Sequence, residues 1–246
     1  MRRPDHAEWG PVMYLAGIPI KGLTRADLFR PDEGLKRIST INAEGIVWYH
    51  EDPLFRRAVQ TSVVCVDGQI PYWLLRLQNR HVALEKLSGS DLVYDFAAFA
   101  AEHDLGVFLL GAHPEANRLS VEHLRMRYGA RIAGYAPPFY PYPFPSFVEE
   151  AIWKRLCAFR PAILFVAFGM PKQERWLYEH HAALEALGVR WAIGVGGAFE
   201  FASGRERRAP RWVQQAGLEA FWRFVQRPAR WRRLLRAFKS FYYVCR

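Results

Sequence analysis

Cysteine is scarce in this chain, with only Cys65, Cys157 and Cys245 among 246 residues. There is no CxxC pair and no even set at regular spacing, so neither a disulfide framework nor a cysteine-based metal site is indicated. HExxH, HxH and Asp-x-Asp motifs are missing as well. We therefore expect reduced thiols in a cytosolic protein, with no metal and no other cofactor.

Long apolar runs are also missing. No uninterrupted apolar stretch approaches the roughly 18–20 residues that a membrane span requires. The opening sequence MRRPDHAEWG has two arginines but no apolar segment behind them, so no signal peptide is indicated. With 51% hydrophobic and 15% aromatic residues, the composition excludes a disordered chain and favours a globular protein with a substantial core.

Acidic residues are rare in the last sixth of the chain. Residues 205–246 contain twelve of the 34 Lys and Arg residues but only two of the 24 Asp and Glu residues. The preceding residues carry 22 of each sign, so the net charge of +10 belongs to the C-terminal segment. We therefore predict a main domain over residues 1–204 and a basic helical appendage over residues 205–246.

Strand-like and helix-like segments alternate along the main domain. After a strand-like opening at 12–20, strands are predicted near 37–42, 62–67, 106–111, 130–135, 162–168 and 190–195. Helices are predicted near 51–60, 71–79, 91–103, 115–128, 146–159 and 171–186. This alternation favours βαβ units and a mostly parallel sheet, which places the chain in the α/β class. The proline-rich segment 135–147 is predicted to be a loop, whose aromatic residues either fold over a site or cover the core.

The appendage is predicted to be helical from Arg211, with Pro228 separating two helices. An apolar face of the second helix comprises Trp231, Leu234, Leu235, Phe238, Phe241 and Tyr242. The basic residues that lie off this face are Arg232, Arg233, Arg236 and Lys239. Such a helix is typical of an interfacial membrane anchor; the alternatives are a terminal helix docked by its apolar side and a nucleic-acid-binding arm.

Several predicted strand ends carry small or polar residues. They are STINA (39–43), VDGQIP (66–71), LLGAHPE (109–115), AFGMPKQE (167–174) and GVGGAFE (194–200). Ligands of open α/β sheets bind at the carboxyl ends of the strands, and glycines there let a phosphate approach the backbone. A nucleotide-type ligand is therefore favoured over glycines that serve packing alone. Asp67 is a candidate for chemistry at such an end, although Asp-Gly is also ordinary turn material.

The ordered motifs together resemble the WecG/TagA/CpsF family of bacterial glycosyltransferases. Those motifs are TINA, VDGQIP, LSGSDL, FLLGA, FGMPKQERW, GVGGAFEFASG, RAPRW, GLEAFWRF and RPARWRR, and the likeness spans roughly residues 12–235. The resemblance implies a Rossmann-like α/β domain with a C-terminal helical appendage that associates with membrane and completes the active site.

The resemblance also implies a reaction. Enzymes of this family transfer a sugar, with inversion, from a uridine-diphosphate donor to a sugar on an undecaprenyl-diphosphate carrier. They act at the cytoplasmic face of the bacterial plasma membrane and serve teichoic acid, capsule and exopolysaccharide synthesis. The donor is of the N-acetylmannosamine, N-acetylmannosaminuronic acid or glucose type, and nothing in this sequence selects among them. The basic appendage is then expected to meet anionic lipid, and a homo-oligomer is compatible with the sequence.

Residue by residue, the resemblance assigns Asp67 as the catalytic base and Thr40 as a second active-site residue. The expected substrate-binding residues are Asn42, Gly68, Gly111, Gly169, Lys172, Gln173, Glu174, Gly196, Gly197, Arg208, Arg223 and Arg230. One carboxylate suffices for a single displacement, because the nucleotide leaves as an anion and needs charge stabilisation rather than a proton. Ala220 and Arg227 depart from the family pattern, which has a tryptophan after GLE and an acidic residue before the proline of RPAR.

Other functions compete with this interpretation. A non-catalytic module that binds lipid, a partner or nucleic acid through the basic arm is the first, and nucleic-acid binding predicts a steep salt dependence. A nicotinamide-dependent sugar-nucleotide enzyme is another, but the chain lacks the GxGxxG fingerprint that such a cofactor needs.

Overall fold

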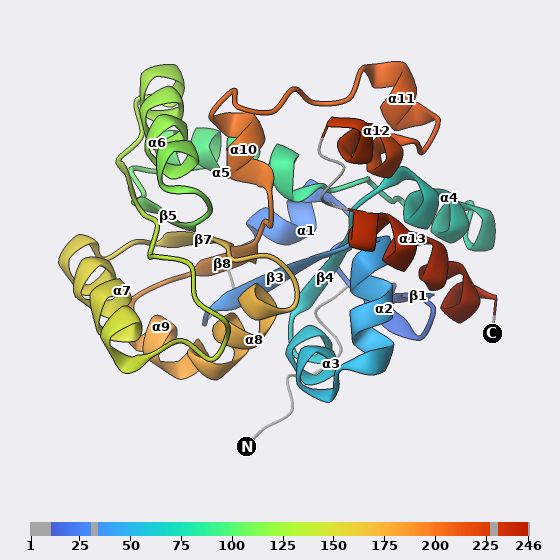
Figure 1. Cartoon of the computed structure of the whole chain (residues 1–246), viewed down its shortest axis with the longest axis horizontal. Helices are drawn as coiled ribbons and strands as arrows, with labels where there is room; N and C mark the ends of the chain where they lie inside the picture. Colours follow the sequence, from blue (N-terminus) through green and yellow to red (C-terminus); the bar gives the residue numbers. More distant parts are fainter. Residues whose placement is uncertain (1–10, 31–33, 227–230, 246) are drawn as a thin grey trace. The chain divides into compact units, whose positions relative to one another are not determined.

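The structure is a computed structural model that describes residues 11–30, 34–226 and 231–245 (Figure 1). Its strands are β1 (Met13–Leu15), β2 (Ile18–Ile20), β3 (Lys36–Ile41), β4 (Val63–Val66), β5 (Val107–Gly111), β6 (Ile132–Tyr135), β7 (Ile163–Ala167) and β8 (Trp191–Gly194). The helices of the first half are α1 (Arg25–Phe29), α2 (Ala43–Glu51), α3 (Pro53–Gln60), α4 (Gln69–Gln78), α5 (Gly89–Glu102) and α6 (Pro114–Tyr128). Those of the second half are α7 (Ser146–Phe159), α8 (Lys172–Glu179), α9 (His181–Leu187), α10 (Ala198–Ala202), α11 (Arg211–Gln215), α12 (Glu219–Gln226) and α13 (Trp231–Val244).

The larger sheet has six strands in the order β4-β3-β8-β7-β5-β6. Strand β8 pairs in parallel with β3 and β7, and β5 pairs in parallel with β7 and β6. The predicted α/β class with a Rossmann-like, parallel sheet is thereby confirmed. The strand-like opening is a separate antiparallel hairpin of β1 and β2, whose two-residue turn has positive φ at both Ala16 (48°) and Gly17 (77°).

The chain divides into two compact units. The first unit takes its residues from 1–30, 41–87 and 209–246, and the second unit from 31–40 and 88–208. The helices α11, α12 and α13 therefore belong to the same unit as β4 and α2. The predicted domain boundary between residues 204 and 205 stays a prediction.

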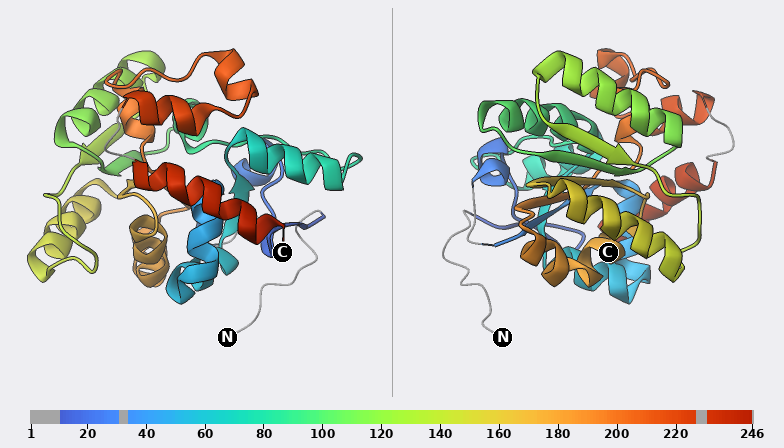
Figure 2. Two further views of the ribbon diagram at one scale, coloured as in Figure 1. Left: turned by 45° about the vertical axis from the view of Figure 1, so that its right-hand side comes forward. Right: turned by 90° about the vertical axis from the view of Figure 1, so that its left-hand side faces the viewer.

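The core of the second unit fills both faces of its part of the sheet. Helices α5, α6 and α10 lie on one face, and α7, α8 and α9 lie on the other (Figures 1 and 2). Side chains alternate along β7, so that Leu164 and Val166 pack with α7 and α8 while Phe165 meets Phe96 of α5. Both faces are apolar because helices cover both, as expected for parallel strands.

The first unit is built around β4 and its neighbouring helices. Its fully buried side chains include Ile18, Ile20, Leu28, Phe55, Val64 and Leu75. The chain turns sharply between α2 and α3, because Asp52 caps α3 through its side chain and Pro53 occupies the first helical position. The helix predicted near 51–60 is thus α3, while α2 and the short α1 were not predicted.

Two further predictions are refined by the structure. The helix predicted near 171–186 is divided at His180 into α8 and α9. In the proline-rich loop, Tyr140, Tyr142 and Phe144 are partly buried against the core, whereas Phe139 is 88% exposed. Most of the loop's aromatic side chains therefore cover the core.

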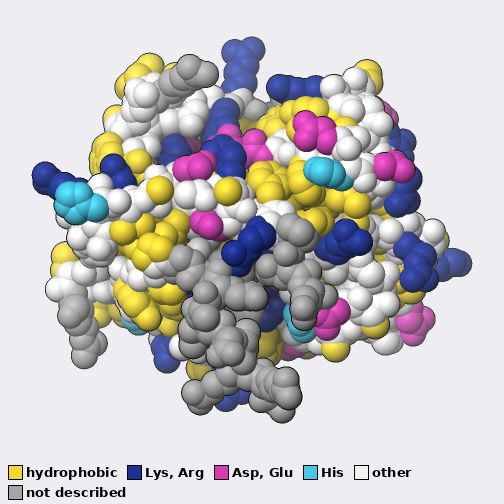
Figure 3. Space-filling view, turned by 180° about the vertical axis from the view of Figure 1, so that it is seen from behind, with side chains coloured by type: hydrophobic (Ala, Val, Ile, Leu, Met, Phe, Trp, Pro, Cys, Tyr) yellow, Lys and Arg dark blue, Asp and Glu magenta, His cyan; other side chains and the backbone are white. Residues whose placement is uncertain are grey.

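Charged side chains are distributed on the face of the molecule seen in Figure 3. The Lys and Arg side chains coloured there are spread among hydrophobic and acidic ones instead of gathering in one area. Within the ranges that the structure describes, no helix is both long and apolar enough to cross a membrane.

Candidate active site

Asp67 follows β4 directly and is half-buried. Its backbone N–H donates to the carbonyl oxygen of Ile41 at 2.8 Å, which holds it beside the end of β3. Gly68 comes next with φ +97°, a conformation that favours glycine, and α4 begins immediately after it. The Asp-Gly pair thus forms a turn and also places a carboxylate at a strand end.

A cavity of about 350 Å³ opens beside Asp67 in the first unit. Its polar lining comes from Asn42, Glu44, Asp67, Gly68, Gln69, Glu219 and Ser240. Its apolar lining comes from Ile46, Ile70, Pro71, Leu74, Leu218, Phe221, Phe224, Ala237, Phe238, Phe241 and Val244. The volume is that of a small-molecule site. Carboxylates that include Asp67, together with the aliphatic and aromatic groups that predominate on α4, α12 and α13, suit a ligand with a polar and an apolar part.

Asn42 has a structural task next to this carboxylate. It is the N-cap of α2, and its side-chain oxygen accepts a hydrogen bond from the N–H of Gly45 at 3.2 Å. The amide NH₂ of the same side chain is a further hydrogen-bond donor. Asn42 therefore both caps α2 and lines the cavity, so the start of α2 lies at the edge of the cavity.

The C-terminal helix exposes most of its predicted apolar face. Trp231, Leu235, Phe238, Phe241 and Tyr242 are between 45% and 64% exposed. The neighbouring helices α11 and α12, the link between them, and α4 also expose large apolar groups, namely Trp212, Leu218, Phe221, Val225, Trp73 and Leu77. We call these eleven side chains the apolar set. Leu234 lies on the same helix, and Arg232 and Arg233 belong to its sequence, but the structure does not describe their side chains.

Thr40, the other predicted active-site residue, lies in the second unit. Its side chain is buried, and its hydroxyl donates to the carbonyl oxygen of Gly194 at 3.1 Å. The only proton of the hydroxyl is used in this bond, so the oxygen is left to accept a hydrogen bond from a ligand. Thr40 thereby fastens the end of β3 to the end of β8.

Gln173 connects two of the predicted glycine-containing turns. Its side-chain oxygen accepts hydrogen bonds from the N–H groups of Gly169 (3.1 Å) and Gly196 (3.0 Å), and its amide nitrogen donates to Glu174 at 2.8 Å. Both side chains are buried. The turns after β7 and β8 are therefore held together by one amide side chain, and contacts of these residues with a ligand stay predictions.

The other glycines of the second unit occupy different surroundings. Gly111 has φ +97°, and a Cβ there would approach Phe168 to 2.9 Å, so glycine is required by both backbone and packing. Gly196 has φ +53°, whereas Gly197 has an ordinary φ of −85°, and nothing lies within 4 Å of a Cβ built at either position. The turn after β8 is therefore open, as the approach of a ligand to the backbone requires.

Lys172 begins α8 and lies over an exposed aromatic ring. Its Nζ is 4.5 Å from the ring centroid of Phe139, a cation–π distance. Partial burial lowers the pKa of the Lys172 ammonium below its usual value. A phosphate bound at this place would reverse part of that effect by stabilising the charged form.

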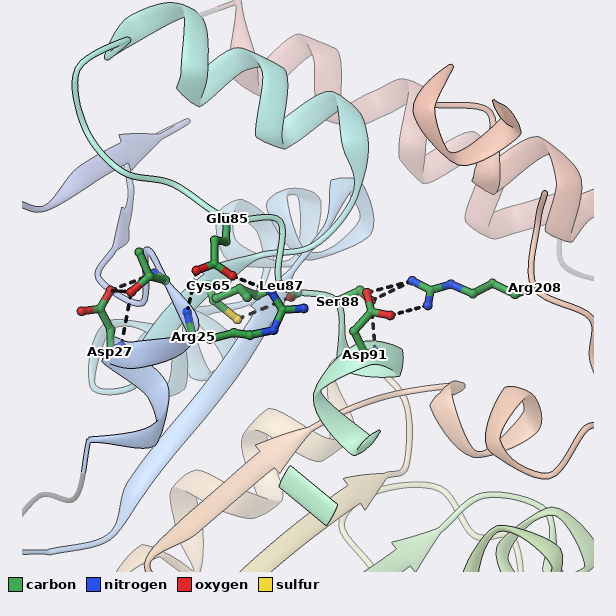
Figure 4. Close-up of polar contacts among 9 residues, drawn as sticks. Arg25, Asp27, Cys65, Glu85, Leu87, Ser88, Asp91 and Arg208 are labelled. Carbon is green, nitrogen blue, oxygen red and sulfur yellow. Dashed lines mark hydrogen bonds and ion pairs between the residues drawn. The ribbon is translucent and has the colours of Figure 1, made fainter. Parts of the chain in front are cut away.

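Arg208 is engaged in a network at the start of α5 (Figure 4). Its guanidinium forms an ion pair with Asp91, with one nitrogen 2.9 Å from Oδ2, and it reaches the hydroxyl of Ser88 at 3.3 Å. Ser88 in turn caps α5. The arginine predicted to bind substrate thus fixes the last residues of the second unit before the chain enters the helices α11 to α13, and its binding of a diphosphate stays a prediction.

The remaining predicted residues lie on the appendage. Arg223 is part of α12, but its side chain is not described. Arg230, together with Pro228 and the atypical Arg227, lies outside the described residues. Ala220 is on α12.

Two other features bear on the chemistry. Burial and the neighbouring Asp67 raise the pKa of the Cys65 thiol, so this cysteine behaves as a neutral core residue next to the site. Among the residues that the structure describes, no group of three or more His, Cys, Asp and Glu side chains is arranged to hold a metal ion.

The fold and the site define an α/β protein with a carboxylate and glycine-containing turns at the carboxyl ends of parallel strands. Comparison with known families is more specific, because the Glycosyl transferase WecG/TagA/CpsF family matches residues 13–246. The chain belongs to this family and is a glycosyltransferase. It is 28% identical over 203 residues to the N-acetylglucosaminyldiphosphoundecaprenol N-acetyl-beta-D-mannosaminyltransferase of Bacillus subtilis (strain 168), covering 80% of this chain and 74% of the relative.

Sequence reasoning missed several residues around the cavity. Phe221 and Phe224 line it from α12, and their i, i+3 spacing in the sequence was the available signal. Asp91 and Ser88 lie within the LSGSDL motif, but nothing in the sequence pairs them with Arg208. Glu44 and Glu51 of α2 were also missed, because the acids of one helix do not reveal which distant bases they meet.

Proposed function

We propose that this glycosyltransferase moves a hexose from a UDP-sugar to a sugar carried on a polyprenyl diphosphate. The observation that carries the proposal is the cavity that joins Asp67 to an apolar wall from α4, α12 and α13. A lipid-linked sugar has the matching chemistry, with hydroxyl groups at one end and an isoprenoid chain at the other. The Bacillus subtilis relative supports the same acceptor class, since its name specifies a sugar on diphosphoundecaprenol.

The proposed reaction is a single displacement with Asp67 as general base. The Asp67 carboxylate takes the proton of an acceptor hydroxyl while that oxygen attacks the anomeric carbon of the donor. The new oxygen–carbon bond forms as the bond from that carbon to the diphosphate oxygen breaks, and inversion follows. UDP leaves with the electron pair of the broken bond and requires stabilisation of charge instead of a proton.

Thr40 and Asn42 are proposed to assist in different ways. Because Thr40 donates to Gly194, its oxygen is available to accept a hydrogen bond from a sugar hydroxyl. The NH₂ of Asn42 is placed at the edge of the cavity and would donate to the acceptor. Thr40 would therefore serve as a hydrogen-bond acceptor and Asn42 as a hydrogen-bond donor.

The donor is proposed to bind at the strand-end turns of the second unit. The open turn at Gly196 and Gly197, together with Lys172, would meet the nucleotide diphosphate, and Gly111 and Gly169 shape neighbouring turns. Buried Gln173 and Glu174 would act by holding those turns. The transferred sugar is of the N-acetylmannosamine, N-acetylmannosaminuronic acid or glucose type; the name of the relative favours N-acetylmannosamine.

The protein is further proposed to act as a peripheral enzyme at the cytoplasmic face of the bacterial plasma membrane. The apolar set supplies side chains that would enter the interfacial region, where Trp and Tyr are favoured. The basic residues of the C-terminal segment would add attraction to anionic lipid, each contributing about 1 kcal/mol near the surface. Self-association through the same side chains is the alternative use of this surface.

The proposal is tested by the substitution D67N, with D104N as the matched control at an exposed aspartate. Transfer is measured from a panel of UDP-sugars to undecaprenyl-diphosphate-linked acceptors. We expect kcat to fall by about 10²–10⁴-fold in D67N, as for removal of a general base, and to be unchanged in D104N. Transfer by D67N at the wild-type rate would disprove the assignment of the base. A wild-type enzyme that consumes no UDP-sugar would disprove the donor class.

A further inference from the structure

The docking of α13 is opposite to that of a terminal helix that packs its apolar side on the protein. Its apolar side chains Leu235, Phe238 and Phe241 are 55%, 64% and 45% exposed, whereas polar Ser240 is only 5% exposed. The helix lies beside α2 in the first unit (Figures 1 and 2). It is therefore attached to the protein through its polar side.

Acidic residues of α2 make this attachment. Arg236 donates to Glu44 at 2.8 Å, and the pair is largely shielded, with side-chain exposures of 36% and 15%. The ammonium of Lys239 is 2.5 Å from Glu51. The hydroxyl of Tyr243 donates to the same Glu51 oxygen at 2.8 Å.

Aromatic groups complete the contact. The Arg236 guanidinium lies over the ring of Trp48, 4.5 Å from its centroid. The rings of His50 and Tyr243 are stacked, with centroids 4.3 Å apart and planes 5° apart. The side chains that make these contacts are charged, polar or aromatic, and Glu44 and Glu51 each have a partner on α13.

The spacing of these residues decides which side of α13 faces the cavity. Arg236, Lys239 and Tyr243 follow at intervals of three and four residues, so they form one stripe of the helix. The residues of α13 that line the cavity, Ala237, Phe238, Ser240, Phe241 and Val244, lie beside that stripe. Fixing the stripe on α2 therefore fixes the rotation of the helix and brings Phe238 and Phe241 to the cavity.

We propose that Glu44 and Glu51 are positioning residues for the acceptor, acting by holding α13 in this rotation. By holding α13, the two acids set the position of the apolar side chains that α13 contributes to the cavity beside Asp67. They do not themselves take part in the reaction. Because Asn42 caps α2 and α2 carries both acids, the same helix sets the polar edge of the cavity and the position of its apolar wall. This inference rests on the proposed function for its effect on catalysis, but the seating of α13 is measurable independently.

The test is a charge exchange at Glu51 and Lys239. E51K and K239E each place like charges together, whereas E51K/K239E restores an opposite pair. With a lipid-linked acceptor in detergent micelles, we expect each single variant to raise the KM for acceptor about tenfold, with the KM for the UDP-sugar unchanged. The double variant should return to within about threefold of wild type. E122K is the matched control, since Glu122 pairs with Arg118 on the exposed surface of α6 in the second unit.

Hydrogen exchange of the α13 amides supplies a second readout that needs no activity. We expect faster exchange in E51K and K239E, wild-type exchange in the exchanged pair and no change in E122K. Single variants with wild-type KM and exchange, or a double variant no better than the singles, would overturn the inference. If wild-type protein transfers no sugar, the proposed function fails, and the seating of α13 is then decided by hydrogen exchange alone.

Discussion

Helices α7 and α13 each have 14 residues and carry both apolar and charged side chains, but the protein covers the apolar side chains of one and the polar side chains of the other. In α7 the apolar residues Val148, Ile152 and Leu156 are at most 2% exposed. In α13 the large apolar side chains Leu235, Phe238 and Phe241 are exposed, and the polar stripe is docked. An amphipathic pattern therefore predicts a helix but not the side that the protein covers. The outward apolar side of α13 requires another partner, which in our proposal is lipid.

The largest expected effect is a difference in the free energy of unfolding between matching leucine substitutions in α7 and α13. Leu156→Ala removes a fully buried side chain of α7 and should lower the free energy of unfolding by about 2–5 kcal/mol. Leu235→Ala makes the same change at a side chain that is 55% exposed on α13, and should change it by less than about 0.5 kcal/mol. Urea denaturation of both variants tests this. Equal losses would mean that α13 is covered in solution.

Polar side chains of the second unit and of α13 should also differ in how much they contribute to stability. Q173A would leave the N–H groups of Gly169 and Gly196 without their present acceptor inside the second unit, and should cost about 1–3 kcal/mol. K239A removes one side of an ion pair at the surface of α13 and should leave the global denaturation midpoint unchanged. Thermal unfolding followed by circular dichroism measures both. A midpoint in Q173A equal to that of wild type would contradict the holding role of Gln173.

Membrane binding should depend on the exposed side of α13 and not on exposed apolar groups in general. L235D should weaken binding to vesicles of phosphatidylglycerol and phosphatidylethanolamine about tenfold, because burial of a leucine side chain is lost. M126D is the matched control, since Met126 is 77% exposed on α6 of the second unit. Co-sedimentation with vesicles gives both affinities. An equal loss in M126D would show that the effect does not belong to α13.

The smallest expected effect is the pH dependence of α13 docking. The hydrogen bond from Lys239, more than its charge, lowers the pKa of Glu51 below its usual 4.5, so this contact stabilises docking above that pH and is lost as pH falls through the lowered pKa. The pKa values of Lys239 and Tyr243 are raised, chiefly by Glu51, so their contributions are present at neutral pH and are lost as pH rises through those raised values. Glu44, Arg236 and His50 also face this contact.

Tryptophan fluorescence reports this change, because Trp48 lies under Arg236. We expect a small spectral shift below about pH 4.5 that precedes global unfolding. The substitution E51Q should remove the part of the shift that Glu51 causes. A shift of the same size in E51Q would assign it to other groups.

Much of the fold was predictable because its signals are local. The buried parallel strands read as short apolar runs, and α4 to α7 were predicted within a few residues. The division between α2 and α3 was missed, since a cap at Asp52 and a proline at Pro53 stop and restart helices within two residues. Short α10 was missed because five residues hold too little periodicity to distinguish a helix from a turn.

The candidate site was predictable only as a set of positions. Strand ends and the family resemblance pointed to Asp67, Thr40 and the glycines, but the partners of polar side chains depend on tertiary structure. The ion pair of Arg208 with Asp91 joins residues 117 positions apart in the sequence. Gln173 accepts hydrogen bonds from the amides of Gly169 and Gly196, which are 4 and 23 positions away. No periodicity in the sequence encodes such pairs, and the acids that hold α13 were missed for the same reason.

The exposed apolar side of α13 also governs how the purified protein should behave in water. In the absence of lipid, the exposed apolar side chains of different molecules should pack against one another. We therefore expect reversible self-association that grows with protein concentration. Mild detergent should reverse it by coating Leu235 and its neighbours, whereas added salt should strengthen it. Light scattering of one sample before and after addition of detergent would therefore measure how much self-association the exposed apolar side of α13 causes.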